Sequence, residues 1–216
     1  MRAYSRSECE LSFIGSTISD LGRFEQAIER FDAVNAEDPN RETGDAAQQP
    51  SALLYAQRMT AMLRRFAPQA SEAVRLAVRC QHIRRWDIPR ASYPRTAAGY
   101  KQWRMRLLSY HAEVAAAILK EAGYDTDMVG RVTSLLKKEG LKRNPATQLL
   151  EDIAALVFLE HYLAAFVELH PEYDAAKFAD ILRKTAKKMS PQGRGAVSDL
   201  IRLPGNLASL VLKVMG

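Results

Sequence analysis

The stretch AGYKQWRMRLLSYHAEVAAAILKEA, residues 98–122, predicts a long amphipathic helix and indicates the fold class. Its apolar side chains recur every three or four positions, so they share one face of a helix. Gly123 follows the last periodic residue, as expected at a helix C-terminus. His111 stands in the middle of the apolar face, where its neighbours at helical spacing are Leu107, Leu108, Val114, Ala115 and Ile118. We therefore expect this helix to direct an imidazole towards the core.

The same periodicity extends over most of the chain. It predicts further helices at about 19–34, 51–66, 71–86, 125–138, 145–169 and 174–188. No stretch alternates apolar and polar residues over the length of a strand, and residues 35–50, rich in Pro, Asn and Asp, are predicted to form a loop. We therefore expect an all-α protein with a loose N-terminus (1–18), a single helical domain (19–189) and a C-terminal segment that docks on it (190–216).

The composition is that of a globular protein, with 47% hydrophobic and 26% charged residues. No apolar run approaches the roughly 18 residues that a membrane-spanning helix needs, and the N-terminus lacks the apolar region of a secretory signal. We expect a cytoplasmic protein with no membrane partner. Of the two cysteines, Cys9 and Cys80, the second is expected to pack in the core rather than form a disulfide. The formal net charge of +6 permits binding to phosphates or nucleic acid.

A second stretch, RCQHIRRWDIPRASYP at residues 79–94, concentrates charge and aromatic rings. It combines a histidine, four arginines, a tryptophan and two prolines. A planar guanidinium matches the oxygens of a phosphate better than the point charge of a lysine does. A further basic run lies at residues 183–194. Because such runs also suit a solvated face, charge alone does not identify the ligand.

Helical spacing places two more ionisable residues towards the core. Asp152 lies on the apolar face of the 145–169 helix, and His82 shares a helix flank with apolar neighbours. An unpaired buried carboxylate costs several kcal/mol, so we expect Asp152 to have a metal ion or a cation as its partner. Together with His111 these residues form the N,O ligand set that suits zinc, iron or manganese. Alternatively, each histidine is a core residue that is hydrogen-bonded within the protein, and Asp152 is paired with an arginine.

These residues resemble the HD superfamily, the all-helical metal-dependent phosphohydrolases named for a His-Asp doublet. The similarity is best from His111 onward, where HAEVAAAILKEAGYDTDMVGRVTSLLKKEG is followed by LLEDIAALVFLE. The resemblance implies an HD-domain-like bundle in which His111 is a metal ligand and Asp152 the closing carboxylate. Gln81-His82 stands where the family has its doublet, and Tyr55 occupies the ligand position of the first His-bearing helix. These departures favour a single metal ion, or a bundle that keeps the shape without a metal.

The chain from about Phe24 to Met189 also resembles a bacterial and fungal family of unknown function. The segments QHIRRWDIPRxxYP, GYxxWR and LEDxxxLVFLE recur in that family. Here they read QHIRRWDIPRASYP, GYKQWR and LEDIAALVFLE. This resemblance covers about three quarters of the chain and implies no activity.

The HD resemblance implies hydrolysis of a phosphate ester or nucleotide by water bound to a metal held by His82, His111 and Asp152. Glu113 or Glu151 would accept the proton from that water. The substrate would be an anionic small molecule or nucleotide. Its phosphate and ring would be bound by Arg79, Arg84, Arg85, Trp86, Arg90 and Tyr93.

Two alternatives stay open. The first is a non-catalytic module that binds nucleic acid or a nucleotide, because residues 79–106 interleave cations with aromatic rings in the manner of single-strand binding proteins. The second is a structural network in which Arg84 or Arg85 pairs with Asp152 and no metal is needed. The sequence predicts no particular oligomeric state.

Overall fold

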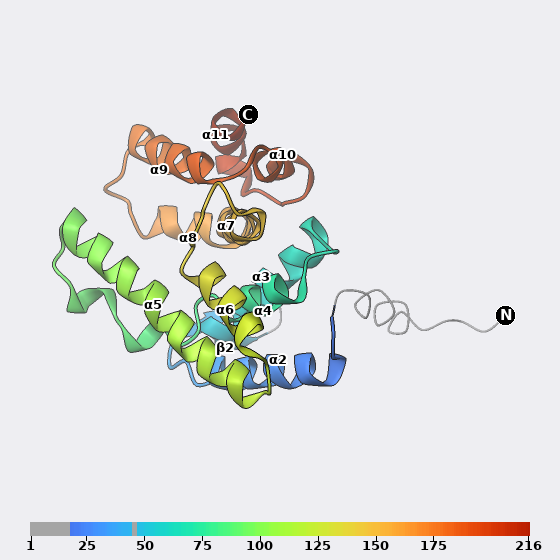
Figure 1. Cartoon of the computed structure of the whole chain (residues 1–216). Helices are drawn as coiled ribbons and strands as arrows, with labels where there is room; N and C mark the ends of the chain where they lie inside the picture. The colour runs from blue at the N-terminus through green and yellow to red at the C-terminus, as the bar shows by residue number, and fades with distance from the viewer. Residues whose placement is uncertain (1–17, 45–46) are drawn as a thin grey trace. The chain divides into compact units, whose positions relative to one another are not determined.

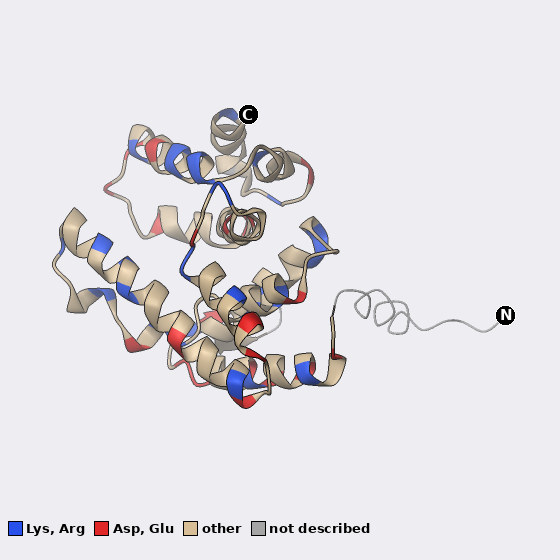
Figure 2. Ribbon diagram, in the orientation of Figure 1, with Lys and Arg blue, Asp and Glu red and all other residues tan. Residues whose placement is uncertain are grey.

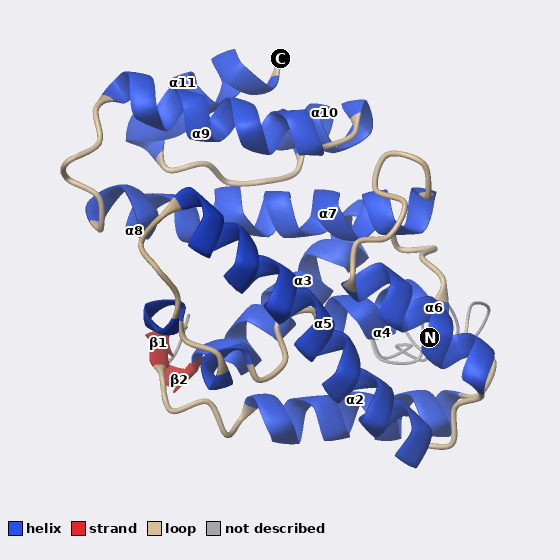
Figure 3. Cartoon of the chain, turned by 60° about the vertical axis from the view of Figure 1, so that its left-hand side comes forward, coloured by secondary structure: helices blue, strands red, loops and turns tan. Residues whose placement is uncertain are grey.

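The computed structural model describes residues 18–44 and 47–216, and it confirms the all-α class (Figure 1, Figure 3). The helices of these residues are α2 (Leu21–Asn35), α3 (Ser51–Phe66), α4 (Glu72–Cys80), α5 (Ala97–Glu121), α6 (Thr126–Leu136), α7 (Pro145–Val157), α8 (Leu163–Glu168), α9 (Ala175–Lys188), α10 (Pro191–Asp199) and α11 (Gly205–Met215). The short helical turns η1 (Arg85–Asp87) and η2 (Arg90–Ser92) are 3-10, and η3 (Phe158–Tyr162) is a π-turn. The predicted loose N-terminus lies outside the described residues except for Ile18.

The prediction of a plain loop at 35–50 is wrong in one respect. Two short strands, β1 (Arg41–Thr43) and β2 (Gln48–Pro50), pair antiparallel with Glu42 opposite Gln49. Three residues are too few to show a periodicity of two, which is why the sequence does not reveal the hairpin.

Local capping signals explain why most helices begin and end where they do. The Asp125 side chain accepts a hydrogen bond from the Met128 backbone N–H at the start of α6, and Asn144 does the same for α7, where Pro145 follows in the first turn. Gly123 ends α5 with a φ of 81°, a left-handed conformation that costs glycine little. These predicted boundaries are confirmed.

The predicted helix 71–86 is too long, because α4 ends at Cys80. Arg84 adopts a left-handed conformation with a φ of 52°, which no continuous α-helix contains. The chain then makes the 3-10 turns η1 and η2 around Pro89. His82 and Trp86 therefore do not lie on a common helix flank. Cys80 is buried as predicted, and burial raises the pKa of its thiol far above the usual range.

The predicted helix 145–169 is also interrupted, by the π-turn η3 between α7 and α8. Such turns insert one residue into a helix and change the direction of the side chains beyond it. Here Glu160, within the turn, accepts hydrogen bonds from Arg65 and from the backbone N–H of Arg202. The π-turn therefore lies where two distant segments are bonded to one carboxylate.

The chain divides into two compact units, each with its own apolar core. Unit 1 contains residues up to 57 and 69–137, and unit 2 contains 58–68 and 138–216. The largest fully buried side chains in unit 1 include Phe31, Leu76, Ile83, Leu107, Leu119 and Leu136. In unit 2 they include Met59, Met62, Leu150, Ile153, Leu156 and Leu159. The predicted boundary at residue 189 stays a prediction.

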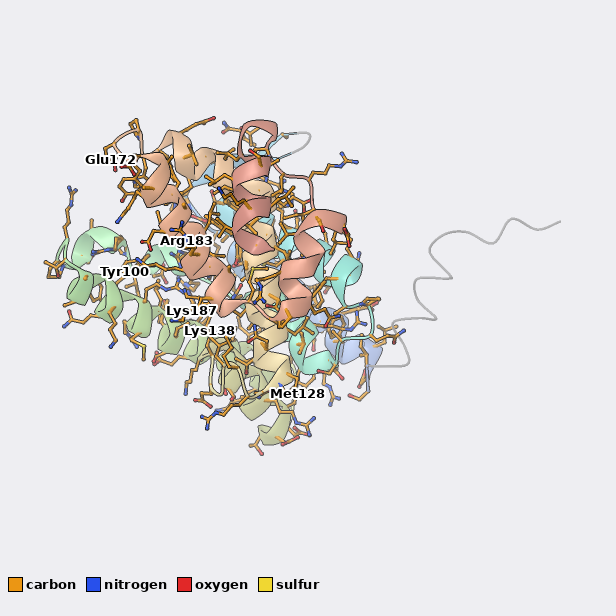
Figure 4. All side chains as sticks on the ribbon, turned by 90° about the horizontal axis from the view of Figure 1, so that it is seen from above. Tyr100, Met128, Lys138, Glu172, Arg183 and Lys187 are labelled. Atoms are coloured by element: carbon orange, nitrogen blue, oxygen red, sulfur yellow. The ribbon has the colours of Figure 1, made fainter. Side chains whose placement is uncertain are left out.

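The two units differ in charge. Unit 2 contains 14 Lys and Arg against nine Asp and Glu, so it carries five of the six net positive charges of the chain. Many of its cations lie along α9, including Arg183 and Lys187 (Figure 2, Figure 4). No helix in the described part of the chain is long and apolar enough to span a bilayer.

Helix α10 offers a matched pair of glycines that tests the packing of unit 2. A Cβ on Gly193 would lie 2.7 Å from the Asp152 carboxylate, whereas a Cβ on Gly195 would meet nothing within 4 Å. We predict that Gly193→Ala lowers the free energy of unfolding by about 1–3 kcal/mol. Gly195→Ala should raise it by up to about 1 kcal/mol, because alanine is the better helix former. Urea unfolding followed by circular dichroism measures both. Equal effects at the two positions would contradict the close packing of Gly193 against Asp152.

Candidate functional site

His111 is the most deeply buried histidine of the candidate site, with 2% of its surface exposed. Its Nδ1 lies 2.7 Å from the backbone carbonyl oxygen of Ile83. A carbonyl can only accept, so Nδ1 carries the proton and donates it. The neutral ring then has its lone pair on Nε2, and this buried atom has no hydrogen-bond partner among the described residues. The prediction that His111 faces inward is confirmed.

The surroundings of His111 keep its ring neutral. Burial lowers its pKa from 6.5 to about 4, and the positive charges of Arg85 and Arg104 act in the same direction. The hydrogen bond to Ile83 opposes these effects without overcoming them. At neutral pH, Nε2 is therefore a hydrogen-bond acceptor.

His82 and Tyr55 adjoin His111 in unit 1. The Tyr55 and His82 rings stack with centroids 4.3 Å apart, and the His82 and His111 centroids are 5.8 Å apart. The Tyr55 hydroxyl donates a hydrogen bond of 2.8 Å to the Gln81 side-chain oxygen. Four positions that the sequence resemblance singled out thus come together in one unit.

The four predicted phosphate-binding arginines have different partners. Arg79 is ion-paired with Asp32. Arg84 is ion-paired with Asp87 at 2.8 Å, and Arg90 donates to the backbone oxygens of Tyr93 and Pro94. Arg85, by contrast, has no ion-pair partner among the described residues, and its Nη1 is buried without a hydrogen bond. Of the four, Arg85 therefore has the guanidinium that a ligand could use.

Arg85 lies in an environment of cations and rings. Its guanidinium carbon is 4.8 Å from the centroid of Trp103, a distance at which a cation is attracted to the ring face. Burial lowers the pKa of Arg85, and the charge of Arg104 lowers it further, while the phenols of Tyr55 and Tyr100 oppose both effects. None of these neighbours is a carboxylate. We call Arg85, Trp103, Arg104 and His111 the Arg85 cluster.

Further aromatic rings lie close to the Arg85 cluster. The guanidinium carbon of Arg90 is 5.9 Å from the centroids of both Tyr100 and Trp103. Tyr100 is 52% exposed near the start of α5 (Figure 4). Trp86 and Tyr93, predicted to stack on a ligand ring, are half-buried.

Asp152 lies in unit 2 and has neutral partners there. It is buried, and its Oδ2 accepts a hydrogen bond of 2.6 Å from the Ser190 hydroxyl. Its Oδ1 accepts from the Ser190 backbone N–H at 2.8 Å and from Gln148 Nε2 at 3.0 Å. These three N–H and O–H donors compensate the burial of the charge, and the expectation of a metal or a cation at Asp152 stays a prediction.

No group of three or more His, Cys, Asp or Glu side chains that could hold a metal occurs within residues 18–44 and 47–216. His82 and His111 come together, but the donor set lacks the carboxylate that the prediction supplied with Asp152. Glu113 is exposed, two positions from His111 on α5 and thus on another face, and is ion-paired with Arg106. Glu151 is ion-paired with Lys138. Both predicted proton acceptors therefore have cationic partners.

Unit 1 also contains an open cavity of about 360 Å³ that no prediction included. It is lined by Ile18, Ser19, Ser71, Glu72, Ala73, Met128 and Arg131. One oxygen of the Glu72 carboxylate accepts from Ser19 and the other from the Tyr124 hydroxyl. Because this acid is already bonded, the Arg85 cluster is the stronger candidate site.

The sequence contains a signal for Tyr100, Trp103 and Arg104, which the predicted phosphate pocket does not include. Tyr100, Trp103, Arg104 and His111 recur at three, four and seven positions along α5, so they share a face of the helix. The stretch 79–106, predicted as a nucleic-acid surface, contains Trp103 and Arg104. The helical spacing groups these two residues with His111.

Residues 25–211 match the family described as Domain of unknown function (DUF4202). No curated protein and no solved structure matches the chain.

The low pKa of His111 predicts how stability depends on pH. Between pH 6.5 and 4 the unfolded chain binds a proton at this position that the folded protein does not bind. The folded state should therefore lose about 3 kcal/mol of stability as the pH falls through this window. His111→Asn has no such group, and its amide can still donate to Ile83. Its loss of stability between pH 7 and 4, measured by urea unfolding, should be smaller by about this amount. Parallel pH profiles for the two proteins would contradict a neutral His111.

Proposed function

The chain belongs to the DUF4202 family, a description that names no activity, and on the geometry of unit 1 we propose that this unit binds a phosphate-bearing ligand at the Arg85 cluster. The observation that carries the proposal is the buried Nη1 of Arg85, which has no hydrogen-bond partner among the described residues. An anion bound there would supply the missing acceptor.

The charge balance of the cluster supports an anionic ligand. Arg85 and Arg104 both act on His111, and no carboxylate is among the groups that shift the pKa of Arg85 or His111. Burying a charge without a counter-charge costs several kcal/mol, so a folded protein retains such a group where something compensates it. Phosphate suits the position, because guanidinium binds its oxygens with paired, charge-assisted hydrogen bonds.

The neighbouring rings favour a small ligand with a flat ring, such as a nucleotide, over a nucleic-acid strand. Tyr100 is exposed beside Arg90 and Trp103, which gives a base or a similar ring a surface on which to stack. The unbonded atoms of Arg85 and His111 are buried, whereas a strand is bound along an exposed groove. Arg85 as a whole is only half-buried, so some of its atoms are in contact with solvent.

Removal of the Arg85 charge should reduce the affinity for phosphate compounds. We predict that Arg85→Gln weakens binding of inorganic phosphate and of nucleoside monophosphates by about 10- to 100-fold, the magnitude expected for a charge-assisted hydrogen bond. Arg106→Gln is the matched control, since it removes the same charge from an exposed, ion-paired position on α5. Isothermal titration calorimetry measures both affinities, with circular dichroism to verify folding. Unchanged affinity in Arg85→Gln, or an equal loss in the control, would overturn the proposal.

A metal-dependent phosphohydrolase is the second candidate function. The observation that favours it is the proximity of His82 and His111, whose ring centroids are 5.8 Å apart, together with the unbonded lone pair of His111 Nε2. Two imidazoles without a carboxylate do not complete the predicted three-ligand set, so we assign no reaction step to a metal.

Elemental analysis of protein purified without a histidine tag separates the two candidates. A metal-dependent enzyme should contain about one zinc, iron or manganese per chain, and the metal should be absent from His111→Ala with the fold intact. Phosphate binding in metal-free protein would instead support the Arg85 cluster acting alone. Metal that persists in His111→Ala would count against His111 as a ligand.

A further inference from the structure

We propose that His111 makes the Arg85 cluster selective for ligands that present an O–H donor beside their anionic oxygens, and that it therefore discriminates phosphate from sulfate. The inference rests on the proposed function and specifies the ligand class further. It concerns the one buried polar atom of the cluster that a fully ionised anion cannot satisfy, His111 Nε2.

The hydrogen bond of the other ring nitrogen, Nδ1, determines that Nε2 is an acceptor. The Ile83 carbonyl accepts the Nδ1 proton at 2.7 Å, which leaves Nε2 with a lone pair. His111 is 2% exposed and Nε2 is without a partner in the described part of the chain, so the atom is a buried acceptor that no protein donor satisfies. Ile83 is thus a positioning residue, and Nε2 is the atom that would contact the ligand.

The cluster combines complementary groups. Arg85 Nη1 is an unbonded donor and His111 Nε2 an unbonded acceptor. The guanidinium carbon of Arg85 is 4.8 Å from the ring centroid of Trp103, which lies on the same face of α5 as His111. Ile83, which binds the ring, and Arg85 are separated by a single residue. A ligand that satisfies both groups must accept from Arg85 and donate to His111.

The chemistry of tetrahedral anions then predicts selectivity. Sulfate has no proton at neutral pH, so one of its oxygens would face the lone pair of Nε2 without a hydrogen bond. Inorganic phosphate keeps at least one proton near neutrality and can donate it. A phosphate monoester loses its second proton near pH 6, and its donor would have to be a hydroxyl of the attached group, as in a sugar phosphate.

Competition between paired ligands tests the inference in the wild-type protein at pH 8. We expect inorganic phosphate to bind at least about tenfold more tightly than sulfate, because a buried acceptor left unpaired is costly. Glycerol 3-phosphate and methyl phosphate form the second pair, since both are dianions and only the first carries hydroxyl groups. Discrimination within the first pair indicates the phosphate proton as the donor, and discrimination within the second pair indicates a ligand hydroxyl.

His111→Asn should abolish the discrimination while leaving the anion site. The asparagine amide can still donate to the Ile83 carbonyl, but no atom replaces Nε2. The ratio of phosphate to sulfate affinity should fall towards one, whereas Arg85→Gln should weaken both anions together. Isothermal titration calorimetry provides the affinities, and circular dichroism verifies that each variant is folded.

The outcomes distinguish the inference from the proposed function. If the wild-type protein binds both members of each pair equally, the role of His111 is overturned and anion binding stands. If it binds none of the four compounds, the proposed function fails. A ratio that is unchanged in folded His111→Asn also overturns the inference. The wild-type comparison decides the matter even if that variant does not fold.

Discussion

The hydrogen bond from His111 to the Ile83 carbonyl is the contact on which the candidate site depends. It joins His111, in the middle of α5, to Ile83 in the irregular segment after α4, 28 positions earlier in the chain. Its net contribution to stability is of the order of 1 kcal/mol. Its larger effect is on orientation, because it determines which ring nitrogen has the lone pair and holds the chain beside Arg85. Without it the imidazole could adopt the other tautomer, and the site would lose its acceptor.

Much of the fold could be predicted because its signals are local. Helix α3 begins at Ser51 and ends at Phe66 as expected, with Pro68 just beyond. The end of α4 could not be predicted, since the left-handed conformation of Arg84 has no local sequence signature. Arginine rarely adopts this conformation, which costs it about 1–2 kcal/mol, and here its side chain pairs with Asp87 in the turn that follows. Contacts formed in the folded protein thus override a helical pattern that continues in the sequence.

The sequence could predict which residues of the site are buried, but it could not predict their hydrogen-bond and ion-pair partners. Periodicity placed His111 and Asp152 in the interior correctly. It could not show that Asp152 is bonded by Ser190, 38 positions further on, or that Arg79 is occupied by Asp32, 47 positions earlier. The four arginines of residues 79–94 look equivalent in the sequence. Only their acceptors distinguish them. Arg79 pairs with a carboxylate from a distant helix, Arg84 with the nearby Asp87, and Arg90 with backbone oxygens.

Helix α3 has a consequence for how the protein can evolve. Its first residues, up to Gln57, belong to unit 1, and the remainder, from Arg58, belongs to unit 2. A fragment that starts at Lys138 would lack Arg65, the ion-pair partner of Glu160. The same fragment would lack Met59 and Met62, two fully buried side chains of the unit 2 core. Because each unit consists of two separate stretches of the chain, a single recombination crossover cannot exchange one unit intact.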